Sequence, residues 1–147
     1  MPLALQINTL KENKIKNVFI KGAISSEFIA NAIAKHQSKT AIGAHNIFLG
    51  QVRADEIDGK VVSAIEYTAY EEMANQKFHN IKENAFSKYD MSCMHIYHSL
   101  GQVKPGEICL FVFVSAPHRK VVFEALTCVV AEMKAHVPVC GKEVFED

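Results

Sequence analysis

The sequence predicts an α+β fold in which a largely antiparallel sheet is flanked by helices. Strand-like and helix-like segments follow one another in the order βαββαββα, and the links between several neighbouring strands have hairpin length. The chain has 147 residues, 49% of them hydrophobic, which suits one globular domain with a sizeable core. We therefore expect a single domain over residues 1–147, with residues 1–16 loosely ordered.

The first predicted elements are a strand and an amphipathic helix. The strand is NVFIKGAI and the helix is SSEFIANAIAKHQ. Ser25 or Ser26 is the expected N-cap. The apolar face of this helix is expected to contain Phe28, Ile29, Ala32 and Ile33.

The next two strands are predicted to form a hairpin. AHNIFLGQVRA alternates as a half-buried strand does, with an interruption at Gly50, and VVSAIEYTAY reads as a second strand. The polar segment ADEIDGK between them is typical of a turn.

A second helix and two further strands follow. The helix is EEMANQKFHNIKENAFSKY, and its apolar residues at near-helical spacing are Met73, Phe78, Ile81 and Phe86. MSCMHIYHSLG and EICLFVFVSA are predicted strands joined at Pro105-Gly106, a pair that favours a type II turn. The apolar density of ICLFVFV indicates a central strand.

The last predicted element is the long helix PHRKVVFEALTCVVAEMKAHV. Ser115 is its candidate N-cap, and Pro117 is placed in its first turn, where proline is tolerated. Pro138 is expected to end it.

Charge and cysteine content exclude several classes of protein. Sixteen basic residues balance sixteen acidic ones, so no global field attracts nucleic acid or an anionic membrane. The sequence has neither an apolar run of about 18 residues nor the pattern of a signal peptide, so a cytoplasmic protein is expected. The four cysteines (Cys93, Cys109, Cys128 and Cys140) lack zinc-finger spacing. We expect free thiols, no structural metal site and no cofactor.

The segment SAPHRK contains one candidate anion site. His118 and Arg119 fall at the start of the last predicted helix, where free backbone N–H groups and the helix dipole favour a phosphate or carboxylate. The alternative is that both side chains are simply solvated. Cations at a helix N-terminus oppose the dipole, which favours the anion-binding interpretation.

Arg53, in FLGQVRA, is a second candidate. It follows a strand glycine and precedes a turn, and its guanidinium could hold a phosphate or carboxylate through two parallel hydrogen bonds. A surface arginine at a strand end is the commoner situation, so the local signal is weak.

The segment KAHVPVCGKE contains two lysines around an apolar turn. Lys134 lies in the last helical turn, where the dipole alone favours a cation, and Lys142 has the alternative explanation of a solvated tail residue. The turn could bring both amines to one pocket. A lysine desolvated there would have a lowered pKa and could serve as acid, base or nucleophile.

Helix length separates two of these candidates. Lys134 follows Arg119 by fifteen residues, which in a helix corresponds to roughly 22 Å. The two residues therefore cannot share one small-molecule site within a chain. Either two sites exist, or a two-fold dimer brings the start of one helix to the end of its mate.

Five ordered segments extend from Gly43 to Glu143, and they read GAHNIFLGQVR, DGKVVSAIEYTAYEEMA, HSLGQVKPGE, VSAPHRKVVFEA and MKAHVPVCGKE. Together they resemble the MoaE family, the large, catalytic subunit of molybdopterin synthase. The resemblance implies an α/β hammerhead-type fold and a homodimer within a heterotetramer. It also implies a small ubiquitin-like sulfur-carrier subunit as partner. The thiocarboxylate on the carrier's C-terminal Gly-Gly would supply sulfur to cyclic pyranopterin monophosphate (precursor Z), forming the molybdopterin dithiolene.

The resemblance also assigns roles to particular residues. Lys134 matches the family's active-site lysine, Arg53 matches the arginine of a GxVR motif, and Phe48 matches a pocket-lining aromatic. His118 and Arg119 match a pair that serves the pterin phosphate from the neighbouring subunit.

Departures from the family pattern cluster after the last helix. Where the family typically reads PIWKKE, this chain reads PVCGKE, so Cys140 replaces a tryptophan and Gly141 replaces a lysine. Lys142 is one position further on and is the candidate substitute, provided that Gly141 lets the backbone turn its amine inward. Ser99 stands where the family commonly has an arginine.

Two alternatives to the synthase remain open from the sequence. The first is a catalytically impaired dimeric module that only binds the carrier. The second is a thiol-dependent sulfurtransferase that uses Cys140.

Overall fold

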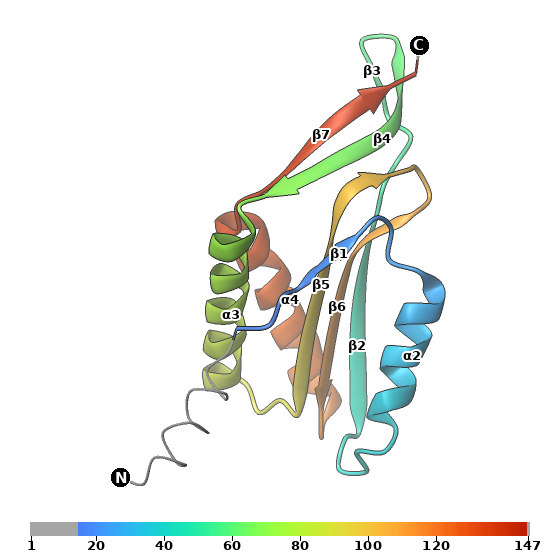
Figure 1. The fold of residues 1–147 in the computed structure, drawn as a ribbon. Helices are drawn as coiled ribbons and strands as arrows, with labels where there is room; N and C mark the ends of the chain where they lie inside the picture. The colour runs from blue at the N-terminus through green and yellow to red at the C-terminus, as the bar shows by residue number, and fades with distance from the viewer. Residues whose placement is uncertain (1–14, 147) are drawn as a thin grey trace, which may run out of the picture.

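The computed structural model describes residues 15–146, so residues 1–14 of the segment expected to be loosely ordered lie outside the described part. Within that part the chain forms three helices and seven strands (Figure 1). In chain order they are β1 (Phe19–Lys21), α2 (Ser26–His36), β2 (Ala44–Gln51), β3 (Glu56–Ile57), β4 (Lys60–Ala69), α3 (Glu71–Lys88), β5 (Cys93–Val103), β6 (Ile108–Ala116), α4 (Arg119–His136) and β7 (Val139–Phe145).

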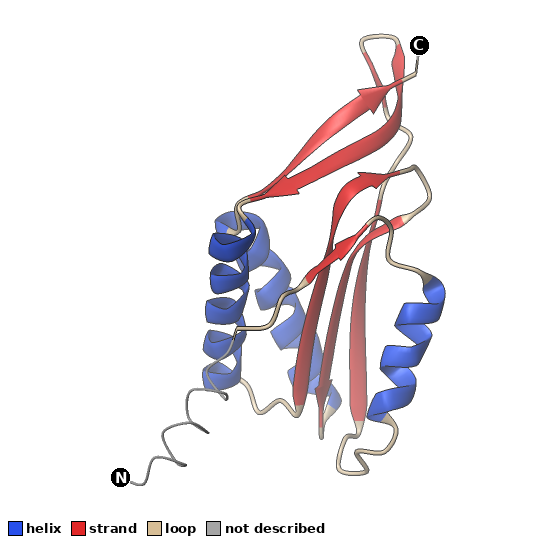
Figure 2. Cartoon of the chain, viewed as in Figure 1, coloured by secondary structure: helices blue, strands red, loops and turns tan. Residues whose placement is uncertain are grey.

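The strands form one mixed sheet in the order β2-β6-β5-β4-β3, with β7 beside β4 and β1 beside β5. Every pairing is antiparallel except β1 with β5. The predicted α+β class with a largely antiparallel sheet is therefore confirmed. Strands β4 and β7 form a ribbon that extends beyond the helices (Figure 2).

Helices cover both faces of the sheet, with α3 and α4 on one face and α2 on the other (Figure 1). Side chains alternate accordingly along β5 and β6. Met94, Ile96, Val112 and Val114 belong to the core under α3 and α4, whereas Phe111 and Phe113 belong to the core beside α2. This two-sided burial explains the continuous apolar run of β6 and confirms that it is a central strand.

The predicted hairpin between β2 and β4 is wrong. Strand β2 pairs with β6, and its register shifts at Gly50/Gln51. Strand β4 instead pairs with the short β3. Asp58 and Gly59 between them both have positive φ (53° and 78°), which is the conformation that a two-residue type I′ hairpin turn requires.

The buried face of α3 agrees with the predicted one at Phe78 and Ile81 and differs from it at Met73 and Phe86. Ala74, Phe78, Ile81 and Ala85 are buried, whereas Met73 and Phe86 are 56% and 38% exposed. The four buried positions repeat at intervals of four, three and four residues, as a helical face does. Two of the four are alanines, whose small side chains give a weak signal in a pattern of large apolar residues.

The helix ends agree with the sequence in part. Ser25 caps α2, because its Oγ accepts a hydrogen bond from the backbone N–H of Phe28 at 3.0 Å. Ser115 does not cap α4: it is a buried residue of β6, and His118 occupies the N-cap position. Pro117 precedes α4, and α4 ends at His136, two residues before Pro138.

Strands β3 and β7 were not predicted separately. In residues 15–146, no helix is both long and apolar enough to cross a membrane.

Candidate active site

An open cavity of about 770 Å³ lies where the ends of β2 and α4 meet β4, β5 and β6. Its lining includes Phe48, Arg53 and Lys134, three residues that the sequence singled out in separate segments. The fold thus brings two cations and an aromatic ring to one concave surface. Such a surface suits a ligand that carries negative charge on an apolar body.

Arg53 reaches the cavity from the segment that follows β2. Its Nη2 donates to Oδ2 of Asp55 at 3.2 Å, and the Arg53 side chain is 80% exposed. An ion pair this exposed contributes only about 0–1 kcal/mol. Asp55 is therefore a weak competitor, and the guanidinium is available to an anionic ligand.

Lys134 reaches the cavity from the last turn of α4. Met133 beside it is buried in the core, which fixes this end of the helix against the sheet and holds Lys134 at the rim. In residues 15–146, no carboxylate lies within 4.0 Å of its ammonium. Lys134 thus faces the cavity without a bound counter-charge from the described chain.

Gly50 shapes the cavity wall by letting strands approach closely. A Cβ atom placed on Gly50 would lie 3.0 Å from Cβ of Leu110 and 3.6 Å from Sγ of Cys109. Both neighbours belong to β6 and line the cavity. The close approach is therefore made by a neighbouring strand of the same chain.

Two polar aromatic residues in the cavity were missed from the sequence. Tyr67 on β4 and His98 on β5 both line it, with ring centroids 5.2 Å apart. Burial, followed by hydrogen bonding to Cys109, raises the pKa of Tyr67 well above its ordinary value, so Tyr67 is a protonated phenol at neutral pH. Both residues lie within segments that carry the family resemblance. That location was the one feature of the sequence that could have identified them as site residues.

His98 is held as a neutral imidazole. Its Nδ1 lies 2.7 Å from the carbonyl oxygen of Ser99, and a carbonyl only accepts, so Nδ1 carries the proton. Burial lowers the pKa of His98, and this effect outweighs the hydrogen bond to Ser99, which raises it. Nε2 is therefore an unprotonated acceptor near neutral pH.

The structure does not bring Lys142 into this cavity. Gly141 pairs with Tyr67 across the β4–β7 ribbon, and a Cβ at Gly141 would lie 3.1 Å from the Tyr67 ring. Because side chains alternate along a strand, Lys142 projects from the opposite face, where it pairs with Glu66. Gly141 has the extended backbone of a β-strand residue and no positive φ. The conformational freedom of this glycine is therefore not used to turn the Lys142 amine toward the cavity.

Cys140 also lies outside the cavity. It is exposed and pairs with Thr68 on the ribbon. The cysteine that does line the cavity is Cys109, whose thiol is 3.4 Å from the carbonyl oxygen of Gly50. The geometry therefore gives no support to chemistry centred on Cys140.

His118 and Arg119 lie at the other end of α4 and are exposed. The first turn of α4 has no acidic residue, and Lys120 adds a third basic side chain. Because Arg119 and Lys134 belong to one uninterrupted helix, the separation of roughly 22 Å expected from the sequence stands. One chain therefore has two distinct cationic regions.

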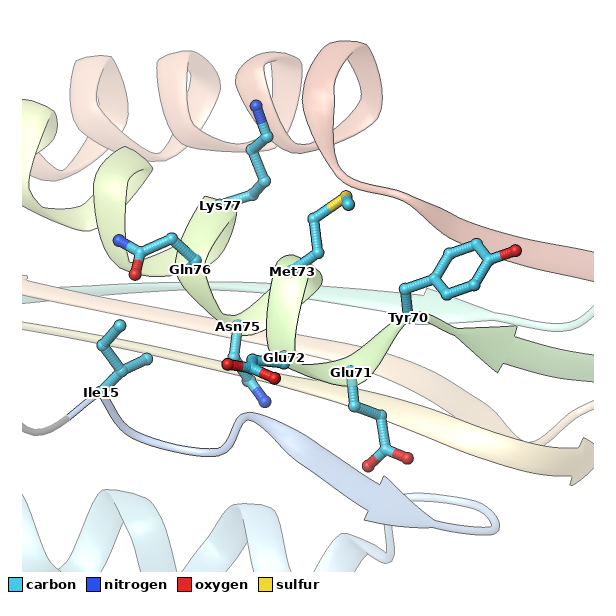
Figure 3. A pocket seen from close by; sticks show the side chains of 8 residues that line it. All are labelled: Ile15, Tyr70, Glu71, Glu72, Met73, Asn75, Gln76 and Lys77. Atoms are coloured by element: carbon cyan, nitrogen blue, oxygen red, sulfur yellow. The ribbon is translucent and has the colours of Figure 1, made fainter.

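A larger cavity of about 950 Å³ lies at the start of α3 and has a different chemistry. Its lining includes Glu71 and Glu72, and among residues 15–146 the one cationic side chain that lines it is Lys77, which points to the other side of α3 from Glu71 (Figure 3). Two carboxylates against one ammonium disfavour an anionic ligand. The cavity with Arg53 and Lys134 is therefore the better candidate for anion chemistry.

Comparison with known proteins shows the family of this chain. The family model described as MoaE protein matches residues 23–136. The molybdopterin synthase catalytic subunit of Pyrococcus abyssi is 38% identical over 110 residues, which is 75% of this chain and 74% of that protein. The protein of the same name from Drosophila grimshawi is 34% identical over 125 residues. This match spans 84% of this chain but 34% of that protein, so the chain covers about a third of this longer relative.

Solved structures show the same fold. Molybdopterin synthase from Staphylococcus aureus superposes with a TM-score of 0.76 at 27% identity, covering 91% of this chain and 95% of that one. A complex of subunits 1 and 2 of molybdopterin-converting factor from Helicobacter pylori contains a chain of similar fold. Its TM-score is 0.75 at 20% identity, with 87% of this chain and 84% of that chain covered. With a family model that matches most of its length and relatives above 30% identity, the chain belongs to the MoaE family.

Proposed function

We propose that this chain is the catalytic subunit of a molybdopterin synthase. In this role it transfers sulfur from a thiocarboxylated carrier to cyclic pyranopterin monophosphate (precursor Z). The observation that carries the proposal is the meeting of Arg53 and Lys134 in one cavity beside Phe48. Two cations at an apolar wall match an extended peptide tail that ends in a negative thiocarboxylate. The names of the family relatives support the same activity.

Arg53 and Lys134 act on the charge of the reacting group. Both cations neutralise the thiocarboxylate when the tail is bound, and they stabilise the negative charge that develops as its carbonyl is attacked. Preorganised charge of this kind is often the largest single catalytic contribution. Lys134 also assists the proton transfers that accompany replacement of oxygen by sulfur on the pterin side chain.

The partner is a small ubiquitin-like subunit with a C-terminal Gly-Gly. The cavity is open on one side and apolar along Phe48, Leu110 and Val139, which suits a narrow tail without side chains. The Helicobacter pylori structure is a complex of two subunits, and we infer a comparable pairing here. The four free cysteines fit the reducing cytoplasm as the place of action.

A homodimer completes the substrate site in this proposal. His118 and Arg119 bind the pterin phosphate, yet they lie roughly 22 Å from Lys134 along α4. A two-fold axis that brings the start of one α4 to the end of its mate joins the two regions. The active assembly is then two catalytic and two carrier subunits, a heterotetramer.

Lys142 has a lesser role in this proposal. It is an exposed cation beside Glu66 on the ribbon next to the cavity. There it adds favourable charge along the approach of the tail, outside the chemical step. This assignment differs from the sequence-based expectation that Lys142 replaces the family lysine at position 141.

The test is product formation from precursor Z and thiocarboxylated carrier. The parent protein is expected to turn over, and Lys134→Ala and Arg53→Ala are expected to abolish most product while carrier binding, measured by calorimetry, stays within a few fold. Carrier binding without any product in the parent would sink the synthase proposal and leave the impaired binding module. Loss of transfer in Cys140→Ser, with carrier binding retained, would favour the thiol route instead.

A further inference from the structure

A second cluster of reactive side chains lies under α2, away from the cavity described above. His36 is the last residue of α2, and Cys93 and His95 are on β5. The donor atoms of these three residues all lie within 4.8 Å of one another. His95 and His98 are three residues apart on β5, so alternation places the cluster and the cavity-lining His98 on opposite faces of the sheet.

The two imidazoles face each other through their Nε2 atoms, which are 3.0 Å apart. Nδ1 of His36 is 2.8 Å from the carbonyl oxygen of Ala32 and therefore carries a proton. Nε2 of a neutral His36 is thus a free lone pair aimed at His95. A backbone carbonyl that fixes the imidazole in this way is a common arrangement behind metal-bound histidines.

Hydrogen bonding within the protein leaves His95 incompletely satisfied. If Nε2 of His95 donates to His36, Nδ1 of His95 must be the acceptor. This buried Nδ1 has no partner in residues 15–146. Buried polar atoms without partners are uncommon in folded proteins and call for a physical explanation. A cation bound between the two Nε2 atoms would replace the imidazole-to-imidazole hydrogen bond, and Nδ1 of His95 would then carry the ring proton as a donor that still needs an acceptor. What favours a cation here is the convergence of the two Nε2 atoms with Sγ of Cys93.

Cys93 adds a soft donor that already has a cation beside it. Cys93 is 8% exposed, and Nζ of Lys39 lies 3.0 Å from its Sγ. Lys39 is itself exposed, in the segment after α2, so its side chain can move into solvent. A metal ion could take the place of this ammonium as the counter-charge of a Cys93 thiolate.

Two imidazoles and one thiolate are the donor set that zinc accepts in protein sites. Tetrahedral zinc with bonds of about 2.0–2.3 Å places its donor atoms roughly 3.3–3.8 Å apart. The Nε2 atoms would separate by a few tenths of an ångström, and the most distant pair would close by about 1 Å. These are side-chain adjustments, and a solvent molecule could complete the fourth position beside the half-buried His95.

We propose that His36, Cys93 and His95 form a binding site for one zinc ion, which joins the end of α2 to the start of β5. The site is independent of the sulfur-transfer chemistry. Neighbour spacing along the sequence gave no sign of it, because His36 lies in a different element from Cys93 and His95. Its expected consequence is structural: bound zinc stabilises the packing of α2 on the sheet.

The direct test is titration of the full-length, reduced protein with Zn²⁺ against a chromogenic chelator, together with a Co²⁺ titration. One ion per chain is expected, and Co²⁺ should give the near-ultraviolet thiolate charge-transfer band and the intense visible bands of a tetrahedral site. Cys93→Ser should abolish the thiolate band, and His95→Gln should weaken zinc binding by at least about tenfold. The matched controls Cys140→Ser and His136→Gln remove exposed donors and should leave stoichiometry and affinity unchanged.

Lys39→Met supplies a test that keeps all three ligands. Because it removes the competing ammonium without removing a donor, zinc affinity is expected to rise. Zinc should also raise the thermal unfolding temperature of the parent but not of Cys93→Ser. Absence of a thiolate-to-cobalt band in the parent protein, or equal zinc affinity in the parent and Cys93→Ser, would overturn the proposal.

Discussion

The end of α4 and the strand that follows it contain two lysines with different surroundings. Lys134 lies on the helix and lines the cavity, whereas Lys142 lies on β7 and points away from Tyr67. The helix positions a side chain by its 3.6-residue turn, while a strand reverses the side at every residue. A shift of one residue along β7 therefore decides whether a lysine amine points toward the cavity or away from it. The short sequence separation between Lys134 and Lys142 does not decide this.

The largest expected effect is at the helix side of this comparison. Replacing Lys134 by alanine removes a charge aimed at the reacting carbonyl, so the turnover rate should fall by about 10²–10³-fold, as it does when one preorganised donor is lost. Single-turnover kinetics with saturating carrier separate this effect from binding. Arg53→Ala is the companion variant and should show a loss of similar size. A Lys134→Ala enzyme that retains more than about a tenth of parental turnover would contradict the assignment.

The second prediction concerns the two ends of α4. Lys134→Ala and Arg119→Ala should each be impaired alone, yet a mixture of the two should regain activity through mixed dimers. In a mixed dimer one composite site has both defects and the other has neither. Random exchange of equal amounts makes half of the dimers mixed, so about a quarter of parental activity is expected.

Size-exclusion chromatography with two differently tagged chains would verify that exchange has occurred. Restoration after exchange identifies a site shared between subunits. If activity stays at the level of the single variants although mixed dimers are present, the phosphate region and Lys134 do not serve one site.

The contrast between α4 and β7 also shows what could be predicted from the sequence. The long α4, the capped α2 and the central β6 are set by local patterns, namely helical periodicity, Ser25 and a continuous apolar run. Strand β7 reads VCGKEVF, with a glycine, two charges and mostly exposed positions, so it has little strand signal of its own. Its conformation depends on pairing with β4, a contact between distant parts of the chain.

The same distinction applies to the site residues. Arg53 and Lys134 were recognisable because each stands at the end of an element, in segments that carry the family resemblance. Tyr67 and His98 were missed because a polar aromatic residue in a strand reveals its partner only after the strands are paired. The opposite faces of Gly141 and Lys142 likewise follow from the register of β7 on β4.

A smaller effect is expected at His98, through pH. Burial lowers its pKa in the folded protein relative to the ordinary value of 6.5. The unfolded chain therefore binds the proton more readily just below 6.5, and the free energy of unfolding falls as the pH drops through this range. His98→Asn keeps a donor for the carbonyl of Ser99 but does not titrate, so its stability should fall less steeply.

Urea unfolding of both proteins at several pH values between about 7.5 and 5 measures the difference. Other histidines contribute equally to both curves, so their difference isolates His98. The groups facing it are the aromatic rings of Phe19 and Tyr67, neither of which changes charge in this range. Parallel curves would show that His98 titrates in the folded state as it does in the unfolded chain.

The smallest effect is expected at Lys142, and it provides the sharpest test of the comparison. Lys142→Ala removes the same unit charge as Lys134→Ala, from a residue eight positions later in the chain. Because Lys142 is exposed on the far face of the ribbon, its electrostatic contribution should be at most about 1 kcal/mol, or roughly fivefold, and should shrink with added salt.

The effect should appear in carrier affinity, with the single-turnover rate close to that of the parent. Lys142→Met keeps most of the aliphatic stem and separates charge from packing. A rate loss as large as that of Lys134→Ala would contradict this prediction. It would mean that β7 rearranges when the carrier binds and that Lys142 then reaches the reacting carbonyl. The pairing of β7 with β4 in the carrier-free chain would then not describe the active site.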